Sequence, residues 1–369
     1  MANSLSAVTP QLLAQGLLAL REESIMARLV NRDYDGLAAQ RGSTVDVPIP
    51  SSITAVAVTA ANTAPSTADV TATSVAIALD QWYEAPFYLT DKELMEVSAG
   101  MLPMQASEAV KAIANNIDSY ILGKYTGVYG FEGTAGTTPF ASTTAAATST
   151  RKTLSNQLAP VGDRRMVIDP DAEANALELR AFQDASFRGD IGGIVNGQIG
   201  RKLGFDWFMD QNVKTHTNTG TGTILVNDAS TAVGDTTITW DGGGTQPAAG
   251  DIFTVAGDTQ TYVVSSATAT VITMQPTLQS VAANNAALTF KASHVVNLGF
   301  HRDAFALAMR PLESSVDGLG NQISVATDPV SGVSMRLEVS REHKRTRYSF
   351  DVLYGAKLVR AELACRMAG

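Results

Sequence analysis

The chain has 369 residues, a formal net charge of −9 and only 17% charged residues. That length supplies about two to three domains' worth of core. The negative charge excludes a protein that grips nucleic acid through a broad basic face. A single cysteine, Cys365, excludes an internal disulfide framework and a thiolate zinc cluster. No signal peptide and no membrane span are expected.

The N-terminal region predicts an amphipathic arm. Thr9 is placed to cap a helix that begins at Pro10. Leu13, Leu17 and Leu20 then fall on one side of this helix. A single apolar stripe needs a surface to cover it, which is either the chain's own core or a neighbouring molecule.

Residues 43–89 predict extended structure. Two runs alternate apolar with other residues, Val45–Ile49 and Val75–Leu79, and a turn signal lies between them at 62–66. We expect a long two-stranded excursion, which is marginal in water without further packing. A flexible surface loop is the alternative. Trp82 and Phe87 belong to an aromatic cluster that we expect to anchor the base of the excursion.

Residues 101–125 predict a long helix. Apolar residues recur at i, i+3, i+4 and i+7, and Pro103 suits the first turn. About 24 residues make a rod of roughly 35 Å. We expect it to act as a spine for sheets from distant parts of the chain; an ordinary amphipathic core helix is the alternative.

The middle of the chain mixes loops with short elements. Gly133–Thr150 is of low complexity and predicts a mobile loop. Arg165–Ile168 predicts a buried strand, and Asp169-Pro170 predicts the start of a helix that runs to about Phe182. A glycine-dense run, Gly189–Gly204, precedes a strand at about 205–213.

Residues 215–290 look like a separate unit. They contain no lysine or arginine, five aspartates and several short alternating runs separated by turn residues. This pattern predicts a small β-barrel or a compact sandwich. Strand-like sequence lies on both sides, so an inserted domain is expected.

Two alternating strands are predicted near the end, at Met335–Val339 and Tyr348–Tyr354, followed by a tail. The basic run Arg341–Arg347 lies between them and contains an acidic residue, Glu342. We expect a solvated hairpin there, or ion pairs between subunits.

The sequence provides no active site. It lacks the nucleophile-elbow, zinc-protease, P-loop and C-x-x-C motifs, and its glycine run lacks the dinucleotide-binding register. The four histidines are scattered, and helix capping explains Asp169, Asp171 and Glu173 more simply than metal binding does. Cys365 is expected to be a small buried side chain. We therefore expect no catalytic, cofactor-binding or metal-binding residues.

Three segments resemble the coat proteins of short-tailed double-stranded DNA phages, typified by the Salmonella podophage coat protein. They are Asn297–Leu312 (NLGFHRDAFALAMRPL), Tyr354–Cys365 (YGAKLVRAELAC) and Gly197–Asp206 (GQIGRKLGFD). The resemblance implies an α+β Hong Kong 97 phage-type capsid fold with an inserted small β-barrel. It assigns 1–42 to an N-terminal arm, 43–89 to an extended loop, 90–150 to a peripheral domain with the spine helix, 151–214 and 293–334 to an axial domain, 215–292 to the insertion, and 335–369 to strands returning to the peripheral domain.

The resemblance implies a structural subunit, not an enzyme, that forms the icosahedral shell around a tailed phage's DNA. Its expected partners are copies of itself in hexamers and pentamers, a scaffolding protein, a portal and packaged DNA that is contained without being read; no membrane is expected. Its expected locations are the virion and, during assembly, the host cytoplasm. Candidate intersubunit residues are Leu13, Leu17, Leu20, Trp82, Phe87, Asp228, Asp235, Asp241 and Asp251.

Two other classes stay open from the residues alone. One is a β-rich adhesin or capsid decoration protein, in which residues 215–290 would recognise the partner. The other is a carbohydrate-active enzyme, which would need a pair of carboxylates that the sequence does not place.

Overall fold

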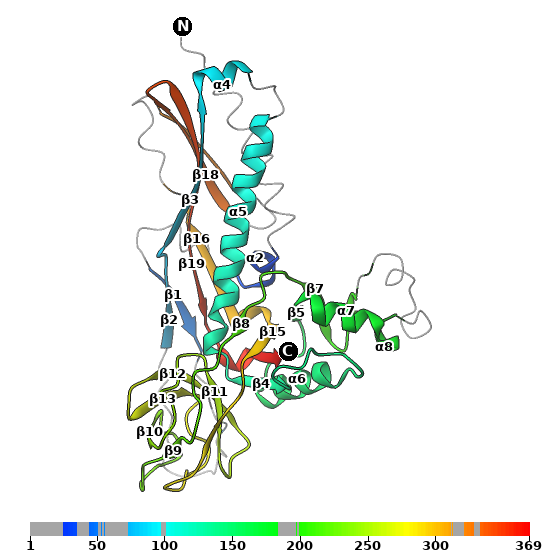
Figure 1. Cartoon of the computed structure of the whole chain (residues 1–369), viewed down its shortest axis with the longest axis vertical. Coiled ribbons are helices and arrows are strands. Elements are labelled where there is room, and N and C mark those ends of the chain that lie inside the picture. The colour runs from blue at the N-terminus through cyan, green and yellow to red at the C-terminus, as the bar shows by residue number, and fades with distance from the viewer. Residues whose placement is uncertain are drawn as a thin grey trace, which may run out of the picture.

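The computed structural model describes residues 25–34, 44–50, 53, 55, 73–96, 101–183, 197, 199–310, 312, 321–327 and 333–369. The predicted arm helix with Leu13, Leu17 and Leu20 lies outside these residues. The chain forms three parts around one long helix: a five-stranded sheet, a mixed sheet flanked by helices, and a separate β module (Figure 1).

The predicted long helix is confirmed as α5, Met101–Gly123, which continues into a short 3-10 helix, η1, Lys124–Gly127. Its buried side chains follow the predicted spacing and include Val110, Ile113, Ile117 and Ile121. They pack against strands of the five-stranded sheet and against the short helix α2, Met26–Leu29. Figure 1 shows α5 lying along the long axis of the molecule.

The five-stranded sheet is organised around its longest strand, β19. This strand pairs antiparallel with β3, β16 and β18, and β17 pairs with β18. The strands are β3 (Gln81–Thr90), β16 (Phe305–Arg310), β17 (Asn321–Thr327), β18 (Ser334–Glu342) and β19 (Arg345–Leu358). A short helix, α4 (Asp91–Glu96), follows β3.

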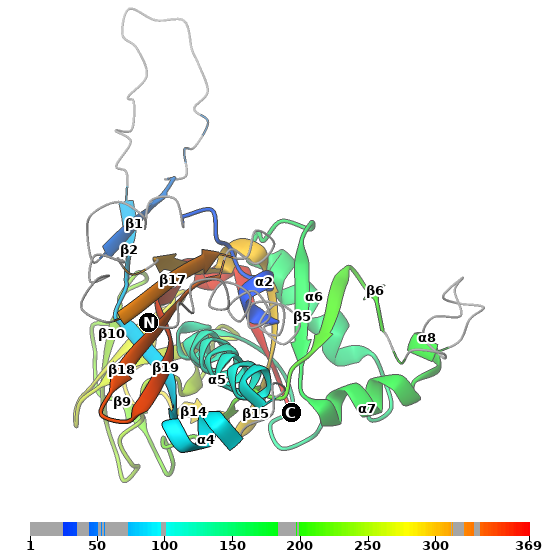
Figure 2. The ribbon, with the colours of Figure 1, turned by 90° about the horizontal axis from the view of Figure 1, so that it is seen from above.

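The predicted two-stranded excursion is confirmed where it is described. β1 (Thr44–Ile49) pairs antiparallel with β2 (Thr73–Ala78), with Val45 opposite Ile77. Figure 2 shows the pair at the edge of the body, on the side away from α7 (Pro170–Glu178) and α8 (Arg180–Gln183). The boundary at residue 89 is wrong, because β3 pairs along its whole length with β19 and belongs to the five-stranded sheet.

The base of this hairpin packs on the body. Val45, Val47, Ile77 and Leu79 form a small cluster with two alanines of β16. Gly355 lets the hairpin approach β19 closely, because a Cβ at this position would overlap the carbonyl group of Ala78.

The mixed sheet joins segments from the whole length of the chain. Its order is β4-β20-β15-β5-β7-β6, and β8 also pairs with β15. The strands are β4 (Gly130–Gly133), β5 (Arg164–Ile168), β6 (Arg201–Lys202), β7 (Phe205–Met209), β8 (Thr215–His216), β15 (His294–His301) and β20 (Ala364–Ala368). Two short 3-10 helices, η2 (Arg302–Ala304) and η3 (Ala361–Leu363), precede β16 and β20.

Two expectations are corrected here. The predicted C-terminal tail is the strand β20, which lies between β15 and β4 and not with β18 and β19. The predicted mobile loop 133–150 ends in a helix, α6 (Ala145–Asn156), so that β4 and α6 belong with the mixed sheet. Hydroxyl groups in α6 bond back to carbonyls one turn earlier, as Thr150 does to Ala146 at 2.8 Å. These bonds satisfy the hydroxyl groups inside the helix.

The predicted helix after Asp169 is confirmed as α7 (Pro170–Glu178), followed by α8 (Arg180–Gln183). Pro170 occupies the first turn as expected, and acidic residues lie near the N-terminus. The Asp169 side chain, however, makes no capping hydrogen bond.

Residues 217–293, here called the module, form a six-stranded antiparallel sheet of order β14-β11-β12-β13-β10-β9. Its strands are β9 (Leu225–Val226), β10 (Thr237–Asp241), β11 (Ile252–Val255), β12 (Thr261–Ala267), β13 (Val271–Gln275) and β14 (Leu288–Phe290). Backbone hydrogen bonds such as Leu288 N to Ile224 O, 2.9 Å, join the two outer edges. The module has its own apolar core and connects to β8 and β15, which pair with each other.

Replacing Gly355 with alanine tests the close approach of the hairpin. The added methyl group must displace β2 or β19, so G355A should lower the free energy of unfolding by about 2–3 kcal/mol. Thermal or urea unfolding of the chain measures this change. The control is G123A, whose Cβ would meet nothing within 4 Å in a helical segment. This control should be neutral or slightly stabilising, and equal effects of the two changes would contradict the packing argument.

Candidate functional site

The two predicted aromatic residues of the hairpin base lie on opposite faces of β3. Trp82 is 64% exposed, whereas Phe87 stacks on Tyr348 with ring centroids 5.1 Å apart. The expected single aromatic cluster is therefore wrong, because alternate residues of a strand point in opposite directions. Trp82 remains available at the surface, and Phe87 contributes to packing.

The face of the sheet that carries Trp82 also carries a ladder of ion pairs. Arg336 pairs with Asp351, which also accepts a 3.4 Å hydrogen bond from Trp82 Nε1. Arg347 pairs with Glu84 at 2.6 Å. These interactions connect three neighbouring strands, β18, β19 and β3.

The basic run Arg341–Arg347 spans the turn between β18 and β19 and the strand residues on either side of it, so the predicted hairpin is confirmed. Its arginines pair within the chain: Arg341 with Asp91, and Arg345 with Glu342. Exposed pairs of this kind contribute little to stability.

The four candidate aspartates of the module have different environments. Asp228 and Asp235 are half-buried and accept backbone hydrogen bonds from Ser230 and Ala232, and Asp241 is exposed. Asp251 is completely buried. The prediction that Asp251 is an intersubunit residue is wrong for this reason.

Asp251 belongs to a buried polar group that we call the junction cluster: Tyr125, His216, Asp251, His294 and Arg366. His216 Nε2 lies 2.9 Å from Asp251 Oδ1, and Tyr125 Oη lies 3.1 Å from His216 Nδ1. Arg366 Nη1 donates to the carbonyl of Gly250 at 2.8 Å, with its guanidinium 4.9 Å from the Tyr125 ring centroid. The cluster thus joins η1, β8, β15 and β20 to the module.

Asp251 also organises the entry to the module. It accepts hydrogen bonds from Thr219 Oγ1 at 2.8 Å, Ala248 N at 2.9 Å and Gly220 N at 3.1 Å. Burial alone would raise the pKa of this carboxyl, but the hydrogen bonds from His216 and these groups outweigh burial and lower the pKa. Asp251 therefore stays ionised inside the protein.

The two other charged or titratable groups at the centre of the cluster are shifted by burial. Burial lowers the pKa of Arg366 to about 9 and that of His294 to about 4. At neutral pH the cluster accordingly combines one carboxylate with one guanidinium and an uncharged His294.

Sequence reasoning treated the four histidines as scattered, yet His216 and His294 are brought together. They are opposite each other in the pairing of β8 with β15, and their ring centroids lie 5.4 Å apart. The available signal was their position at the two ends of the proposed insertion. No pattern in the sequence connects them to Arg366, which comes from the C-terminal strand.

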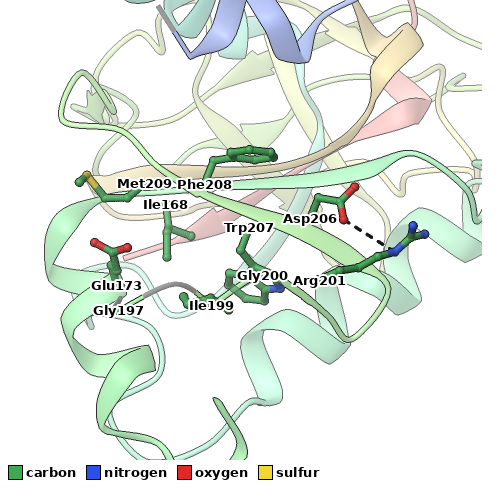
Figure 3. A pocket seen from close by; sticks show the side chains of 10 residues that line it. All are labelled: Ile168, Glu173, Gly197, Ile199, Gly200, Arg201, Asp206, Trp207, Phe208 and Met209. Atoms are coloured by element: carbon green, nitrogen blue, oxygen red, sulfur yellow. Dashed lines mark ion pairs between the residues drawn. The ribbon is translucent and has the colours of Figure 1, made fainter. Parts of the chain in front are cut away.

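A cleft lies beside α7 and β7 (Figure 3). Ile168, Ile199, Trp207 and Met209 form much of its wall, and Glu173 faces it from α7. Burial raises the pKa of Glu173. The second carboxyl of the wall, Asp206, pairs with Arg201 at 3.7 Å. Among the described residues that line the cleft, none is a histidine or a lysine that could orient these acids.

Within the part of the chain that the structure describes, no group of His, Cys, Asp and Glu could hold a metal ion. Among the same residues, no helix is long and apolar enough to span a membrane.

Comparison with solved structures identifies the fold. The chain is similar to a chain in the capsid structure of the cyanophage P-SCSP1u, with a TM-score of 0.53, 12% identity, and coverage of 93% of this chain and 87% of that chain. The chain has a phage capsid fold. A chain from Mycobacterium phage Che8 matches with a TM-score of 0.52, 17% identity, and coverage of 93% and 90%. Searches against protein-family models and curated proteins found no match.

Replacing Asp251 with asparagine tests the role of its charge at the junction. Asparagine cannot accept all the hydrogen bonds that the carboxylate accepts, so D251N should lower the free energy of unfolding by about 2–4 kcal/mol. Thermal unfolding and hydrogen exchange of residues 217–220 measure the effect. The matched control is D241N, which changes an exposed aspartate and should leave the melting temperature unchanged.

The pH dependence gives a second check on the same variant. Because the pKa of Asp251 is lowered in the folded protein, its contribution is present above the unfolded value of about 4 and is lost as the pH falls through the folded value. The difference between wild type and D251N should therefore hold from pH 7 to pH 5 and shrink only in stronger acid. A difference that disappears by pH 5 would contradict the assignment.

Proposed function

We propose that this chain is the major capsid protein of a tailed double-stranded DNA phage, a structural subunit that assembles with copies of itself into an icosahedral shell. The supporting observation is the fold shared with the P-SCSP1u capsid structure over 93% of this chain. A likeness of that extent leaves only about 7% of the chain unmatched.

The finer proposal is a Hong Kong 97 phage-type capsid protein of the Salmonella podophage type. Residues 1–42 are assigned to the arm, 43–79 to the extended loop, and α5 with the five-stranded sheet to the peripheral domain. The mixed sheet is assigned to the axial domain and the module to the inserted β-barrel. Supporting this assignment, the module's outer edges are hydrogen-bonded to each other, and the chain enters and leaves it through paired strands.

Contact between copies gives a physical reason for two features of the chain. The described part of the β1–β2 hairpin buries only a few side chains on its own body, and the charged fraction of the whole chain is only 17%. In a shell, apolar area buried between neighbours stabilises each contact by roughly 25 cal/mol per Å², although association costs offset part of that gain. Many weak contacts repeated over a closed surface then hold the particle together.

The proposal includes the partners and locations expected of a capsid subunit. These are hexamers and pentamers of the chain, a scaffolding protein, a portal, and packaged DNA held without sequence reading. The protein would work in the virion after assembly in the host cytoplasm. Its role would be structural and not enzymatic, with no cofactor.

Expression of the chain alone, followed by electron microscopy and sedimentation, tests the proposal. We expect closed shells, tubes or ring-shaped capsomers, either spontaneously or with crowding agents or a candidate scaffolding protein. A uniform monomer or trimer that stays inert under all these conditions would overturn the proposal and favour an adhesin or decoration protein.

Two substitutions on opposite faces of β3 separate assembly from folding. W82A removes an exposed ring and should leave the melting temperature of the subunit nearly unchanged while lowering the yield of particles. F87A removes a ring stacked on Tyr348 and should lower the free energy of unfolding by about 2–3 kcal/mol. The measurements are subunit unfolding and sedimentation of assembled material. Normal assembly of W82A would exclude this residue from the contact surface.

A further inference from the structure

The module is attached to the body through a small apolar contact beside the junction cluster. Tyr129 packs with Ile252 and Val263, and Thr261 Oγ1 donates to the Tyr129 carbonyl at 2.8 Å. The module core is otherwise separate from the core around α5. The orientation of the module therefore depends heavily on the polar groups at this one place.

His294 has one satisfied and one unsatisfied ring nitrogen. Its Nδ1 lies 2.8 Å from the carbonyl oxygen of Ala292, so Nδ1 carries the proton and donates it. Its Nε2 is buried and has no hydrogen-bond partner among the described residues. A second proton would have to be placed on this nitrogen, where no acceptor is available.

The surroundings of His294 make that second proton costly. Arg366 is completely buried, and its Nε and Nη2 also lack partners among the described residues. The ring centroids of His216 and Phe131 lie 5.4 Å and 5.1 Å from that of His294. Lys291 Nζ lies 5.7 Å from the centroid of the Phe131 ring. Among the described residues, Asp251 provides the negative charge that acts on His294, and His216 and Thr219 already bind it.

We propose that His294 is a pH-sensitive latch, which holds the module against the body when neutral and releases it when protonated. Protonation adds a positive charge beside Arg366 and an N–H without an acceptor, in a site that both parts of the protein enclose. When the module moves away from β15 and β20, water can hydrate both the protonated His294 and Arg366. This hydration removes the free-energy cost of burying the two positive charges together. The cluster lies within one chain, so the proposal does not rest on shell formation.

The direction and range of the effect follow from proton linkage. Burial lowers the pKa of His294 to about 4 in the docked state, against about 6.5 for an exposed histidine. The released state therefore binds more protons between these values, and docking weakens as the pH falls from 6.5 toward 4. The docking equilibrium should change by up to about tenfold per pH unit, and by about 40-fold between pH 6.5 and 4.5, because the effect levels off near each pKa.

Five other titratable or charged groups face or border His294. Asp251 is ionised throughout this range because its pKa is lowered. Burial raises the pKa of Tyr125, and Arg366 stays charged well above neutral pH. Burial also raises the pKa of Cys365, the neighbour of Arg366 in β20, so its thiol stays protonated. His216 is the remaining group, and its two ring nitrogens are already paired with Asp251 and Tyr125.

A distance measurement across the junction tests the latch. Cysteines at Val233 in the module and Leu158 in the body, 62% and 88% exposed, accept a donor and an acceptor dye; the native Cys365 is buried. Energy transfer is recorded in the full chain as urea is raised, at pH values from 7.5 to 4.5, with circular dichroism followed in parallel. As the pH is lowered, the urea concentration at the midpoint of the distance change should decrease. At each pH it should lie below the urea concentration at which secondary structure is lost.

Variants at two histidines test whether His294 causes the pH dependence of the urea midpoint. H294N keeps a side-chain donor for the Ala292 carbonyl but cannot be protonated. Between pH 6.5 and 4.5, its urea midpoint of the distance change should therefore decrease by less than half as much as that of the wild type. H343N removes an exposed histidine in the β18–β19 turn and should behave like wild type. If H294N fails to fold, H294Q serves the same purpose. A midpoint that does not fall with pH in wild type, or that falls equally in the histidine-294 variants, would overturn the proposal.

Discussion

The apolar side of α5 has to be covered, and the segments that cover it come from both ends of the chain. α2 and β3 precede the helix, whereas β19 comes more than 200 residues after it. The mixed sheet continues the same core through residues such as Phe300, Phe305 and Met367. Because one continuous core serves both sheets, neither sheet can shift without disturbing the other. The body therefore behaves as one rigid unit against which the hairpin and the module are placed.

The module is held in a different way. Its own core would survive separation from the body, so the contact between the two has to specify orientation more than stability. Buried charges suit this purpose, since a buried carboxylate or guanidinium without its partners costs several kcal/mol. The hydrogen bonds of Asp251 to His216 and of Arg366 Nη1 to the Gly250 carbonyl form only in the docked arrangement. The polar junction selects one orientation among those that the small apolar contact would tolerate.

Patterns that are local in sequence could be predicted, and interactions between distant residues could not. The spacing along α5 and the alternation in β1 and β2 reflect burial on one face, which leaves a periodic signal. α6 was missed because small and hydroxyl-bearing residues give little periodicity. β20 was missed because all of its residues, ACRMA, are buried, so that nothing alternates. Asp251 was assigned to the surface by its charge; its partners at 216–220 and 248 come together only through the fold of the module.

The position of β20 has a consequence for how the protein is made. β20 pairs in parallel with β4, although 230 residues lie between Gly133 and Ala364. The mixed sheet cannot close until the ribosome has synthesised residue 368, whereas the module's strands are all available about 80 residues earlier. Local contacts form faster than distant ones, so the module should be folded while β4 and β15 still await their partner. Arg366, carried by that last strand, would then complete the junction and the sheet in the same step of biosynthesis.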